Sequence, residues 1–576
     1  YPFIRRNAER NMREYYNRSM VERDDERCEI QFAEIMKRIQ TLYNLSDEQT
    51  ELLGQWEIEA ELDNVIPLEK TITHVKQLLA QNEEVILISD MYLPKNVIQK
   101  MLAIADPILA ELPLYLSSEL GYQKSAKSLY LEVYRQYAPD YRFGRWIHTG
   151  DNLHSDIKCP RSYNIETVTI KRLEFNQYEE ALVQELQSYD GYLIAASMAR
   201  FREQHRSMQD QFAYSFISLL FVPYVRWAMN SCKEQGKENV YLISRDGHQL
   251  KRIADVVNEL EQLGLNTKYI YASRRVWRIP SFFDHIDVGF WGQGYGNMAK
   301  VNKFSKLLKA LDMDEDTFRQ MFPELCALNE DTEIDAQEIV HLADIFKNSE
   351  KYLQYLLKKA EEERYATCEY LKQEMDLNAP YAIIEYWGRG YTQENFTRLW
   401  QHICGRKEPT TFYYSRSTLP SDEDNIRMNF TSHPSSQAFI ESIFACINYK
   451  TVENYERING KWTPVTEEIV CEQDLFYAME KYLPEFAKEY CTLPLTDRDT
   501  TGRGLIDFAI SWYAEHPEWE GFTAVLAELV DSVEMYGNKT AFAKELTMED
   551  LDAIVEDKQE YFYLISSCGE GCSAEI

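Results

Sequence analysis

Between residue 70 and about residue 172 the sequence alternates between amphipathic segments and short apolar runs, and this alternation restricts the fold more than any other feature. Strand-length runs that follow helix-length segments, several times in succession, predict parallel strands connected by helices. Such a sheet is covered by helices on both faces, so its strands are rich in aliphatic residues. We therefore predict an α/β domain with helices at 71–81, from about 96, and at 126–137, and strands at 83–89, 112–118, 145–151 and 165–170.

Polar residues follow three of these predicted strands. The first strand ends at Ser89, Lys124 follows the second at the expected start of a helix, and Asp151 and Asp156 follow the third. Because the carboxyl ends of parallel strands meet at one edge of a sheet, we expect these side chains to lie together. Hydroxyl and ammonium groups hold phosphate oxygens and carboxylates hold Mg²⁺, so the set predicts phosphoryl transfer. Taken singly, each residue is better explained as a helix cap, a turn or a surface charge.

The rest of the chain divides into further regions. Residues 1–65 are predicted to be helical, and with 66–185 they form a first domain. A second alternating region occupies 186–470, with strands expected in NVYLISRDG, YAIIEYWGRG and TTFYYSRST and a helical insertion at about 296–376. Residues 471–576 are predicted to be mostly helical. The expected fold is thus two α/β domains, the second Rossmann-like.

Three segments of the first domain resemble motifs of the haloacid dehalogenase-like (HAD-like) hydrolases. LISDMYLP at 87–94, YLSSELGYQK at 115–124 and HTGDNLHSDI at 148–157 are similar to the second, third and fourth motifs. More narrowly, they resemble the bacterial branch encoded among cell-surface polysaccharide genes and often fused to glycosyltransferases. LISRDG at 242–247 and YASRRVWRIPS at 271–281 are similar to segments in the second half of those proteins, so the resemblance covers most of the chain.

The resemblance implies a HAD-like Rossmannoid sheet with a helical cap formed by residues before 65. It also implies roles for individual residues. Ser89 would bind phosphate, Lys124 would stabilise the phosphoryl group, and Asp151 with Asp156 would hold Mg²⁺.

The first motif of that family is absent from the chain. In the family it is a strand that ends in a nucleophilic aspartate, with an acid–base aspartate two residues later. The segment LDMDEDTF at 311–318 contains aspartates, but it joins two predicted helices and is expected to be a connection with an aspartate cap. A chain without the motif is expected to be inactive as a phosphatase.

The missing strand also matters for the sheet. In the family it is central, so its loss would leave unpaired backbone groups in the strands on either side. We expect residues upstream of Tyr1 to supply the strand and its aspartates. The alternative is a degenerate enzyme that fills the gap in another way.

Arginines follow the expected strands of the second domain. Their planar, multidentate guanidinium groups suit phosphate and carboxylate ligands. The alternative is that they pair with Asp246, Glu385 and other acids to fix the edge of the sheet. If the site is functional, it would take a phosphorylated sugar, a nucleotide-sugar or an acidic glycan, with His248 or Glu385 as acid or base. The arginines are Arg245, Arg274, Arg275, Arg389 and Arg416.

Composition narrows the class of partner and the compartment. The net charge is 62 − 94 = −32, which disfavours nucleic acid and anionic membranes. The 11 cysteines are scattered, which fits a reducing cytoplasm, and the close pair Cys568 and Cys572 is interpreted as free thiols, since zinc needs four ligands. The most apolar run, from Phe212, contains Pro223 and Arg226 and is predicted to be a buried helix with a kink, not a membrane span.

Three hypotheses of function follow. The first is Mg²⁺-dependent phosphoryl chemistry on a sugar phosphate or glycan intermediate in surface-polysaccharide assembly, a pathway implied only by the resemblance. The second is a non-catalytic scaffold that binds a glycosyltransferase. The third is a transferase whose site lies in the second domain.

Overall fold

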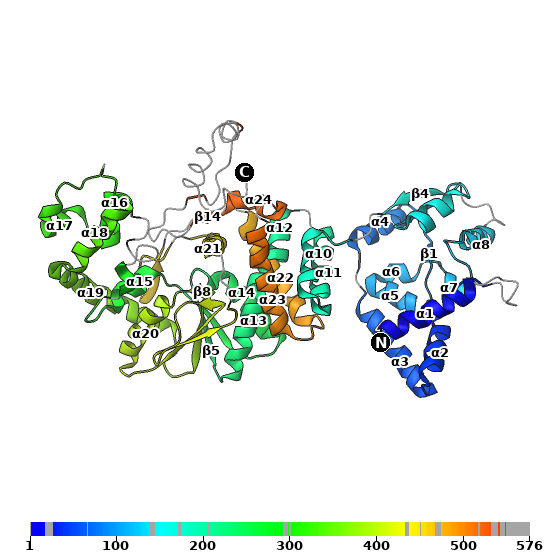
Figure 1. The fold of residues 1–576 in the computed structure, drawn as a ribbon, viewed down its shortest axis with the longest axis horizontal. Helices are drawn as coiled ribbons and strands as arrows, with labels where there is room; N and C mark the ends of the chain where they lie inside the picture. Colours follow the sequence, from blue (N-terminus) through cyan, green and yellow to red (C-terminus); the bar gives the residue numbers. More distant parts are fainter. Residues whose placement is uncertain are drawn as a thin grey trace. The chain divides into compact units, whose positions relative to one another are not determined.

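The computed structural model shows a mixed α/β protein with parallel sheets (Figure 1). It divides into two compact units, Tyr1–Glu174 (unit 1) and Phe175–Ile576 (unit 2). It describes residues 2–17, 27–65, 67–137, 144–170, 174–204, 207–286, 288–291, 298, 301–330, 332–432, 437–449, 451–466, 474–516, 519–531, 540–541 and 548.

Unit 1 contains the alternating elements that the sequence predicts, with shorter strands than expected. Its strands are β1 (Leu87–Ser89), β2 (Leu114–Leu116), β3 (Ile147–Gly150) and β4 (Glu166–Thr169). Its helices are α1 (Pro2–Asn17), α2 (Phe32–Tyr43), α3 (Asp47–Asp63), α4 (Glu69–Ala80), α5 (Lys95–Ala105), α6 (Pro107–Ala110), α7 (Ser117–Leu120), α8 (Ser128–Tyr137) and α9 (Cys159–Arg161), and a π-helical turn, η3, spans Leu153–Lys158.

The strands of unit 1 form two separate parallel pairs. Strand β1 pairs with β2, in the register Leu87 to Leu114, and β3 pairs with β4, in the register Ile147 to Glu166. Within the described ranges, no ladder joins β1 to β3. Apolar side chains near the ladders are also uncovered, since Ile147 is 46% exposed and Val168 is 50% exposed. The β3–β4 pair therefore leaves two of its apolar side chains partly uncovered.

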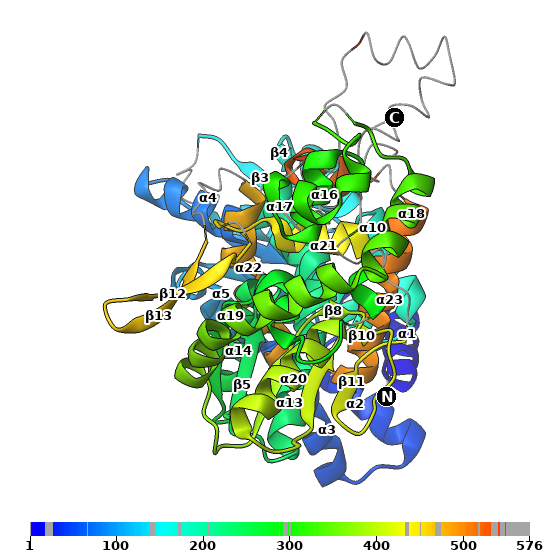
Figure 2. The same ribbon diagram turned by 90° about the vertical axis from the view of Figure 1, so that its left-hand side faces the viewer.

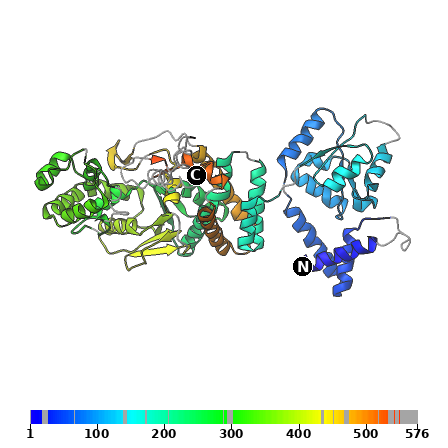
Figure 3. The same cartoon turned by 45° about the horizontal axis from the view of Figure 1, so that its top comes forward.

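Helices α1–α3 form a group beside the α/β part of unit 1 (Figure 3, dark blue against light blue). Their apolar side chains, among them Ile35 of α2, share one core with Val97 of α5 and Leu116 of β2. The segment before α2 also contacts the loops that follow β1 and β2. The backbone N–H of Phe32 donates to the carbonyl of Tyr92, and the Gln31 side chain donates to the carbonyl of Ser118.

Unit 2 is built on a five-stranded parallel sheet in the order β11–β9–β7–β5–β6. The chain runs from β5 outward to β6, then returns to β7 on the other side of β5, so the order reverses between β5 and β7. Ligands of open α/β sheets bind at such a switch point, outside the carboxyl ends of the strands. The strands are β5 (Asn239–Ile243), β6 (Asn266–Ile270), β7 (Tyr381–Ile384), β9 (Thr410–Tyr414) and β11 (Asn425–Asn429), and a short parallel pair, β8 (Trp387–Gly388) with β10 (Arg416–Ser417), follows β7 and β9.

Helices cover both faces of this sheet. Alternate residues of β5 point to opposite sides, so Leu242 joins one core and Tyr241 joins the other. The core on the Leu242 side includes α10 (Gln177–Leu186), α11 (Tyr189–Gln204), α12 (Met208–Phe212), α13 (Ser218–Glu234), α14 (Gly247–Leu260), α22 (Asp474–Thr492) and α23 (Arg498–Glu515). The core on the Tyr241 side includes α15 (Arg274–Arg278), α19 (Glu350–Glu374) and α20 (Tyr391–Cys404).

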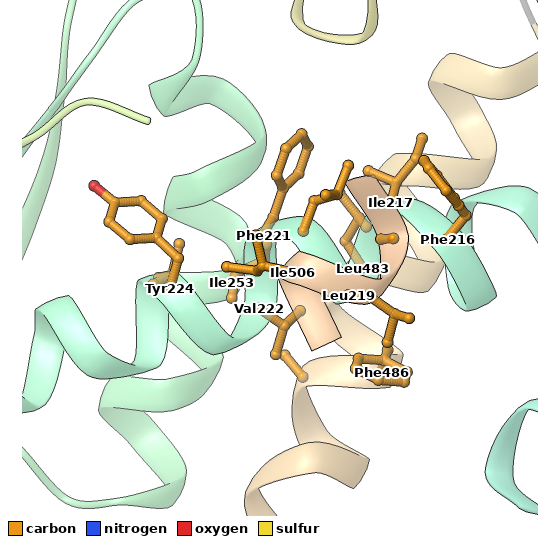
Figure 4. Packing of buried hydrophobic residues seen from close by; sticks show 14 of the residues in the cluster. Phe216, Ile217, Leu219, Phe221, Val222, Tyr224, Ile253, Leu483, Phe486 and Ile506 are labelled. Carbon is orange, nitrogen blue, oxygen red and sulfur yellow. The ribbon is translucent and has the colours of Figure 1, made fainter. Parts of the chain in front are cut away.

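The apolar run from Phe212 lies inside unit 2. The helical stretch Met208–Glu234 has the length and hydropathy of a membrane span, but 89% of its most apolar window is buried within the protein. Figure 4 shows Phe221 of this stretch, Ile253 of α14, Leu483 of α22 and Ile506 of α23 meeting in one cluster. Pro223 lies inside α13, as expected. The run is therefore a core helix here.

The helical insertion lies between β6 and β7 and has its own core, which includes Phe304, Phe318 and Phe346. Its helices are α16 (Phe304–Leu311), α17 (Glu315–Met321) and α18 (Ala336–Lys347), followed by α19. The segment LDMDEDTF is the connection between α16 and α17, and Asp314 caps α17 by accepting from the backbone N–H of Thr317. A hairpin of β12 (Asn454–Ile458) and β13 (Lys461–Val465) projects from the unit (Figure 2).

Two predicted boundaries differ from the observed units. The first domain ends at Glu174 and not near residue 185, because Tyr178 and Leu182 of α10 belong to the core of unit 2. The region after residue 470 is not separate, because α22 and α23 complete that same core. Its remaining elements are α24 (Glu520–Thr523) and the short pair β14 (Val530–Asp531) and β15 (Thr540–Ala541), and α21 (Gln437–Ala445) lies before the hairpin. Cys568 and Cys572 lie outside the described residues.

Gly247 opens α14 directly against β5, and its replacement tests that packing. A Cβ atom at Gly247 would lie 2.6 Å from the carbonyl carbon of Leu242, a backbone atom that cannot move aside. Gly247→Ala is expected to destabilise unit 2 by about 1–3 kcal/mol, the usual cost of overpacking. Urea unfolding measures the change, with Gly504→Ala in α23 as the control, since a Cβ there makes only ordinary contacts. Equal stabilities of the two variants would contradict this packing.

Candidate functional sites

The structure brings together two of the four residues predicted in unit 1. Ser89 is the last residue of β1, and Asp151 directly follows β3 with an exposed side chain. Lys124 lies in the turn before α8, which begins at Ser128, and not at the start of a helix as expected. Its Nζ atom lies 2.6 Å from Oδ1 of Asp156, which belongs to η3 after β3. This ion pair therefore connects the loop after β2 with the loop after β3.

Asp156 is the centre of a buried hydrogen-bond network. His148 Nε2 lies 3.1 Å from its Oδ1, and the backbone N–H of Asn152 donates to its Oδ2 at 3.0 Å. Burial alone would raise the pKa of Asp156, but the hydrogen bonds from His148 and Lys124 outweigh it and hold the pKa well below its ordinary value. The Tyr130 hydroxyl contacts His148 Nε2 at 2.9 Å and donates to the carbonyl of Ser155. Asp156 is thus a carboxylate at neutral pH.

Gly150 makes room for this carboxylate. It is the last residue of β3, and a Cβ atom there would lie 2.5 Å from Cγ of Asp156. A side chain at this position would displace Asp156 from Lys124 and His148. Gly150 is therefore needed for the hydrogen-bond network of Asp156 and not only for the turn at residues 150–151.

A further carboxylate in this region has a structural role. Asp90 follows Ser89 and accepts from the backbone N–H of Lys124 at 2.8 Å, which fixes the turn that carries the lysine. Burial raises the pKa of Asp90, against the effect of that hydrogen bond. Neither Asp90 nor His148 was predicted as part of the site, although both lie within the motif segments.

The carboxylates do not complete the Mg²⁺ site that the resemblance implies. Mg²⁺ requires octahedral oxygen ligands, several of them from carboxylates, substrate or water. Asp156 is already engaged by Lys124 and His148, and Asp151 is the only other predicted ligand. Across the described ranges, no group of three or more His, Cys, Asp or Glu side chains is arranged to hold a metal ion. These side chains alone therefore do not fit the ion.

Unit 2 has a pocket at the switch point of its sheet. The cavity is about 130 Å³ and lies at the carboxyl ends of β5, β6 and β7. Ser244 joins two of its loops, since its hydroxyl donates to the carbonyl of Ala272 and accepts from the N–H of Ala272. The lining includes Arg245 and Asp246 after β5, Arg274 and Arg275 after β6, Glu385, Trp387 and Thr392 after β7, and Glu441, Phe444 and Tyr449 from α21 and the loop after it.

The five predicted arginines have different positions. Arg245 and Arg274 line the pocket, and Arg389 lines an adjoining cavity of about 50 Å³. Arg275 also contributes to the lining, but its guanidinium lies 2.8 Å from Asp312 of the insertion. Arg416 donates to the carbonyl of Ser432 and lines neither cavity. The ion pair with Asp312 thus explains the position of Arg275. Arg245 and Arg274 are the two arginines of the main cavity that are left to bind an anion.

Three carboxyl groups line the pocket, and two of them, Asp246 and Glu385, have raised pKa values. Burial and, next, repulsion from Asp246 raise the pKa of Glu385 to about 8, against attraction from Arg274. Burial and repulsion from Glu441 raise the pKa of Asp246 to about 6, against attraction from Arg245. At neutral pH Glu385 is therefore mostly protonated. Strongly perturbed acids in a cleft are typical of functional sites.

His248 does not contribute to this pocket. It lies in the first turn of α14, where its Nε2 atom is 3.2 Å from Oε1 of Glu480 on α22, and its ring stacks on Phe476. Burial lowers the pKa of His248, against the effect of Glu480. Of the two acid–base candidates in the second domain, only Glu385 lines the cavity. Glu441 and Tyr449 were not predicted, and no local sequence signal distinguishes them.

Comparison of the chain with known protein families and with curated proteins found no match to either.

Proposed function

We propose that unit 1 is a HAD-like phosphoryl-transfer domain that acts on a sugar phosphate or glycan intermediate of cell-surface polysaccharide assembly. The observation that carries this proposal is the Lys124–Asp156 ion pair, which joins the loops after β2 and β3 at a distance of 2.6 Å. In this role Lys124 would neutralise phosphate oxygens, and the Ser89 hydroxyl at the end of β1 would donate to one of them. The pathway and the cytoplasmic location rest on the sequence resemblance and composition alone.

The open pairs of strands also support a HAD-like sheet. In the described residues β1 pairs only with β2 and β3 only with β4, so β1 and β3 each have an edge along which a further strand could pair. In the family that the motifs resemble, this is the position of the strand that carries the nucleophile. Phosphatase activity requires such an aspartate beside Lys124. Among the described residues of unit 1, the aspartates that form hydrogen bonds with Lys124 are Asp90, which accepts from its backbone N–H, and Asp156, an expected metal ligand.

The contacts of α1–α3 support their role as a cap. The segment before α2 forms hydrogen bonds to the segments that follow β1 and β2. The segment after β2 is the one that contains Lys124. A cap at this place would exclude water from a bound phosphate and would select the rest of the substrate.

The proposal is tested by the effect of Asp151→Asn on phosphatase activity of the protein isolated from its host. Asp151 is exposed, so the variant is expected to fold normally. Because the resemblance makes Asp151 a Mg²⁺ ligand, with further ligands to come from substrate and water, the variant is expected to lose activity at least about 100-fold toward sugar phosphates, measured with and without added Mg²⁺. Arg274→Ala in unit 2 is the control and should keep full activity. Intact mass and N-terminal sequencing of the same sample show whether the measured chain contains an Asp-X-Asp strand.

The reverse result would favour a different class of protein. If Arg274→Ala abolishes turnover while Asp151→Asn does not, the reaction belongs to a transferase site in unit 2. A protein that turns over no phosphate ester at all, but binds a glycosyltransferase, would be a scaffold. Either outcome contradicts the phosphatase proposal.

A further inference from the structure

The pocket of unit 2 consists of two adjoining cavities. The main cavity of about 130 Å³ and the smaller one of about 50 Å³ share Arg274, Glu385, Trp387 and Thr392 in their linings. Their combined size is below the range of drug-sized sites, so the space suits a ligand of one phosphate and one small ring. Trp387 gives one wall an aromatic surface, on which a sugar ring can pack.

Two guanidinium groups supply positive charge to the main cavity. Arg245 follows β5, and its guanidinium has no hydrogen-bond partner among the residues that the structure describes, although its backbone carbonyl accepts from the N–H of His248. Arg274 begins α15, and its Nη2 atom lies 3.7 Å from Oε1 of Glu441, beyond hydrogen-bond distance. Both groups therefore keep donors for an anion. Guanidinium groups from two different loops can hold two sides of one phosphate.

Glu385 places an unsatisfied polar atom at the same wall. Its Oε2 atom is buried and has no hydrogen-bond partner in the described part of the chain. Most buried polar atoms in folded proteins have partners, so an unsatisfied one beside a cavity indicates a ligand group. Glu385 follows β7 and therefore lies on the opposite side of the switch point from Arg274, which follows β6.

We infer that this pocket binds a phosphorylated monosaccharide, with the phosphate held by Arg245 and Arg274 and with Glu385 hydrogen-bonded to the ligand. This site is in unit 2 and goes beyond the phosphoryl-transfer function proposed for unit 1. It requires no covalent step.

The protonation of Glu385 decides how it acts on an anion. With a pKa raised to about 8, its carboxyl group is neutral at pH 7 and donates a hydrogen bond to a phosphate oxygen, whereas the ionised form would repel it. Affinity is therefore expected to fall as the pH rises above about 8. The charged and titratable groups that surround Glu385 are Arg245 and Asp246 after β5, Arg274 on α15, Arg389 after β8, Glu441 on α21, and the hydroxyl groups of Tyr224, Thr392 and Tyr414.

Isothermal titration calorimetry of the full chain tests the ligand class. Glucose 1-phosphate is expected to bind more tightly than inorganic phosphate, and glucose is expected not to bind. Arg245→Ala should weaken glucose 1-phosphate binding about 10- to 100-fold, Arg245→Lys should restore part of the loss, and Arg416→Ala should have no effect. Failure of both phosphate probes to bind, or equal binding to the wild type and Arg245→Ala, would overturn the site. Equal affinity for the two phosphate probes would overturn the sugar assignment.

The role of Glu385 is tested with sulfate, whose charge does not change across the relevant pH range. The wild type is expected to lose about tenfold in affinity for each pH unit above 8, because binding then requires Glu385 to take up a proton. Glu385→Gln keeps the neutral hydrogen-bond donor, so its affinity should stay constant. A flat profile in the wild type, or the same decline in both proteins, would remove Glu385 from the site.

Discussion

Replacing Lys124 with methionine is expected to destabilise unit 1 by about 3 kcal/mol near neutral pH. The side chains of Lys124 and Asp156 are 14% and 4% exposed, and removal of one partner from a buried pair leaves the other charge poorly compensated. His148 and the N–H of Asn152 retain two hydrogen bonds to Asp156, so the loss should lie at the lower end of the usual range of 3–5 kcal/mol. Hydrogen exchange of peptides from β3 and β4 measures the change.

The pH dependence of this loss has a definite sign. The pKa of Asp156 is lower in the folded protein than in the unfolded chain, so the pair contributes its full stability above about pH 4. The difference between the wild type and Lys124→Met should therefore shrink as the pH falls below about 4. Lys158→Met, at an exposed lysine close to the same network, is the control and should change exchange little. Exchange rates of β3 and β4 within threefold of the wild type would show that the pair is not formed.

Replacing Glu385 with glutamine is expected to make unit 2 more stable than the wild type at high pH. The unfolded chain releases the Glu385 proton near its ordinary pKa of 4.5, whereas the folded protein keeps it to about pH 8. Raising the pH through this interval therefore favours the unfolded wild type, by up to about 1.4 kcal/mol for each pH unit. The advantage of the variant should grow from near zero at pH 4.5 to as much as about 5 kcal/mol at pH 8, and then level off.

Urea unfolding followed by tryptophan fluorescence measures this advantage, because Trp277 and Trp400 are buried in unit 2. Glu362→Gln makes the same chemical change at an exposed position on α19 and is the control. Asp246 is present in both proteins, so its own titration near pH 6 cancels in the comparison. A constant difference between the wild type and Glu385→Gln across this range would mean that Glu385 is ionised in the folded state.

The sequence predicted most of the sheet strands, and the misses have physical reasons. Strands β5, β7 and β9 are buried on both faces, so their apolar runs are clear. Strand β11, with the sequence NIRMN, was not identified. It contains Arg427, which is buried because its guanidinium pairs with Glu394 of α20 and Asp422, and a hydrophobic pattern cannot anticipate such a pair. The predicted domain boundary at residue 185 was wrong because α10 packs against α23, whose residues follow it by more than 300 positions in the sequence.

The candidate sites were predictable only in part for a similar reason. Strand ends locate Lys124, Asp156, Arg245 and Glu385 at sheet edges, but the sequence does not show which neighbours they meet. Arg274 and Arg275 are adjacent and both line the pocket, yet only Arg275 pairs with Asp312 of the insertion, which depends on the direction of the first turn of α15. The raised pKa of Glu385 depends on burial and on Asp246, and both arise from the register of β5 with β7.

The closure of the unit 2 core by its last helices has a consequence for synthesis of the chain. Asp190 of α11 accepts hydrogen bonds from Thr496 and Thr501, and Glu489 of α22 accepts from Arg200 and Tyr214. At roughly 5–20 residues per second, the ribosome needs on the order of 10–60 s to reach α22 after completing α13. During that interval the apolar helical stretch Met208–Glu234 exposes to solvent the face that α22 later buries. Chains that stop before residue 474 should therefore aggregate or be held by chaperones, and native folding of unit 2 should begin only after α22 and α23 emerge.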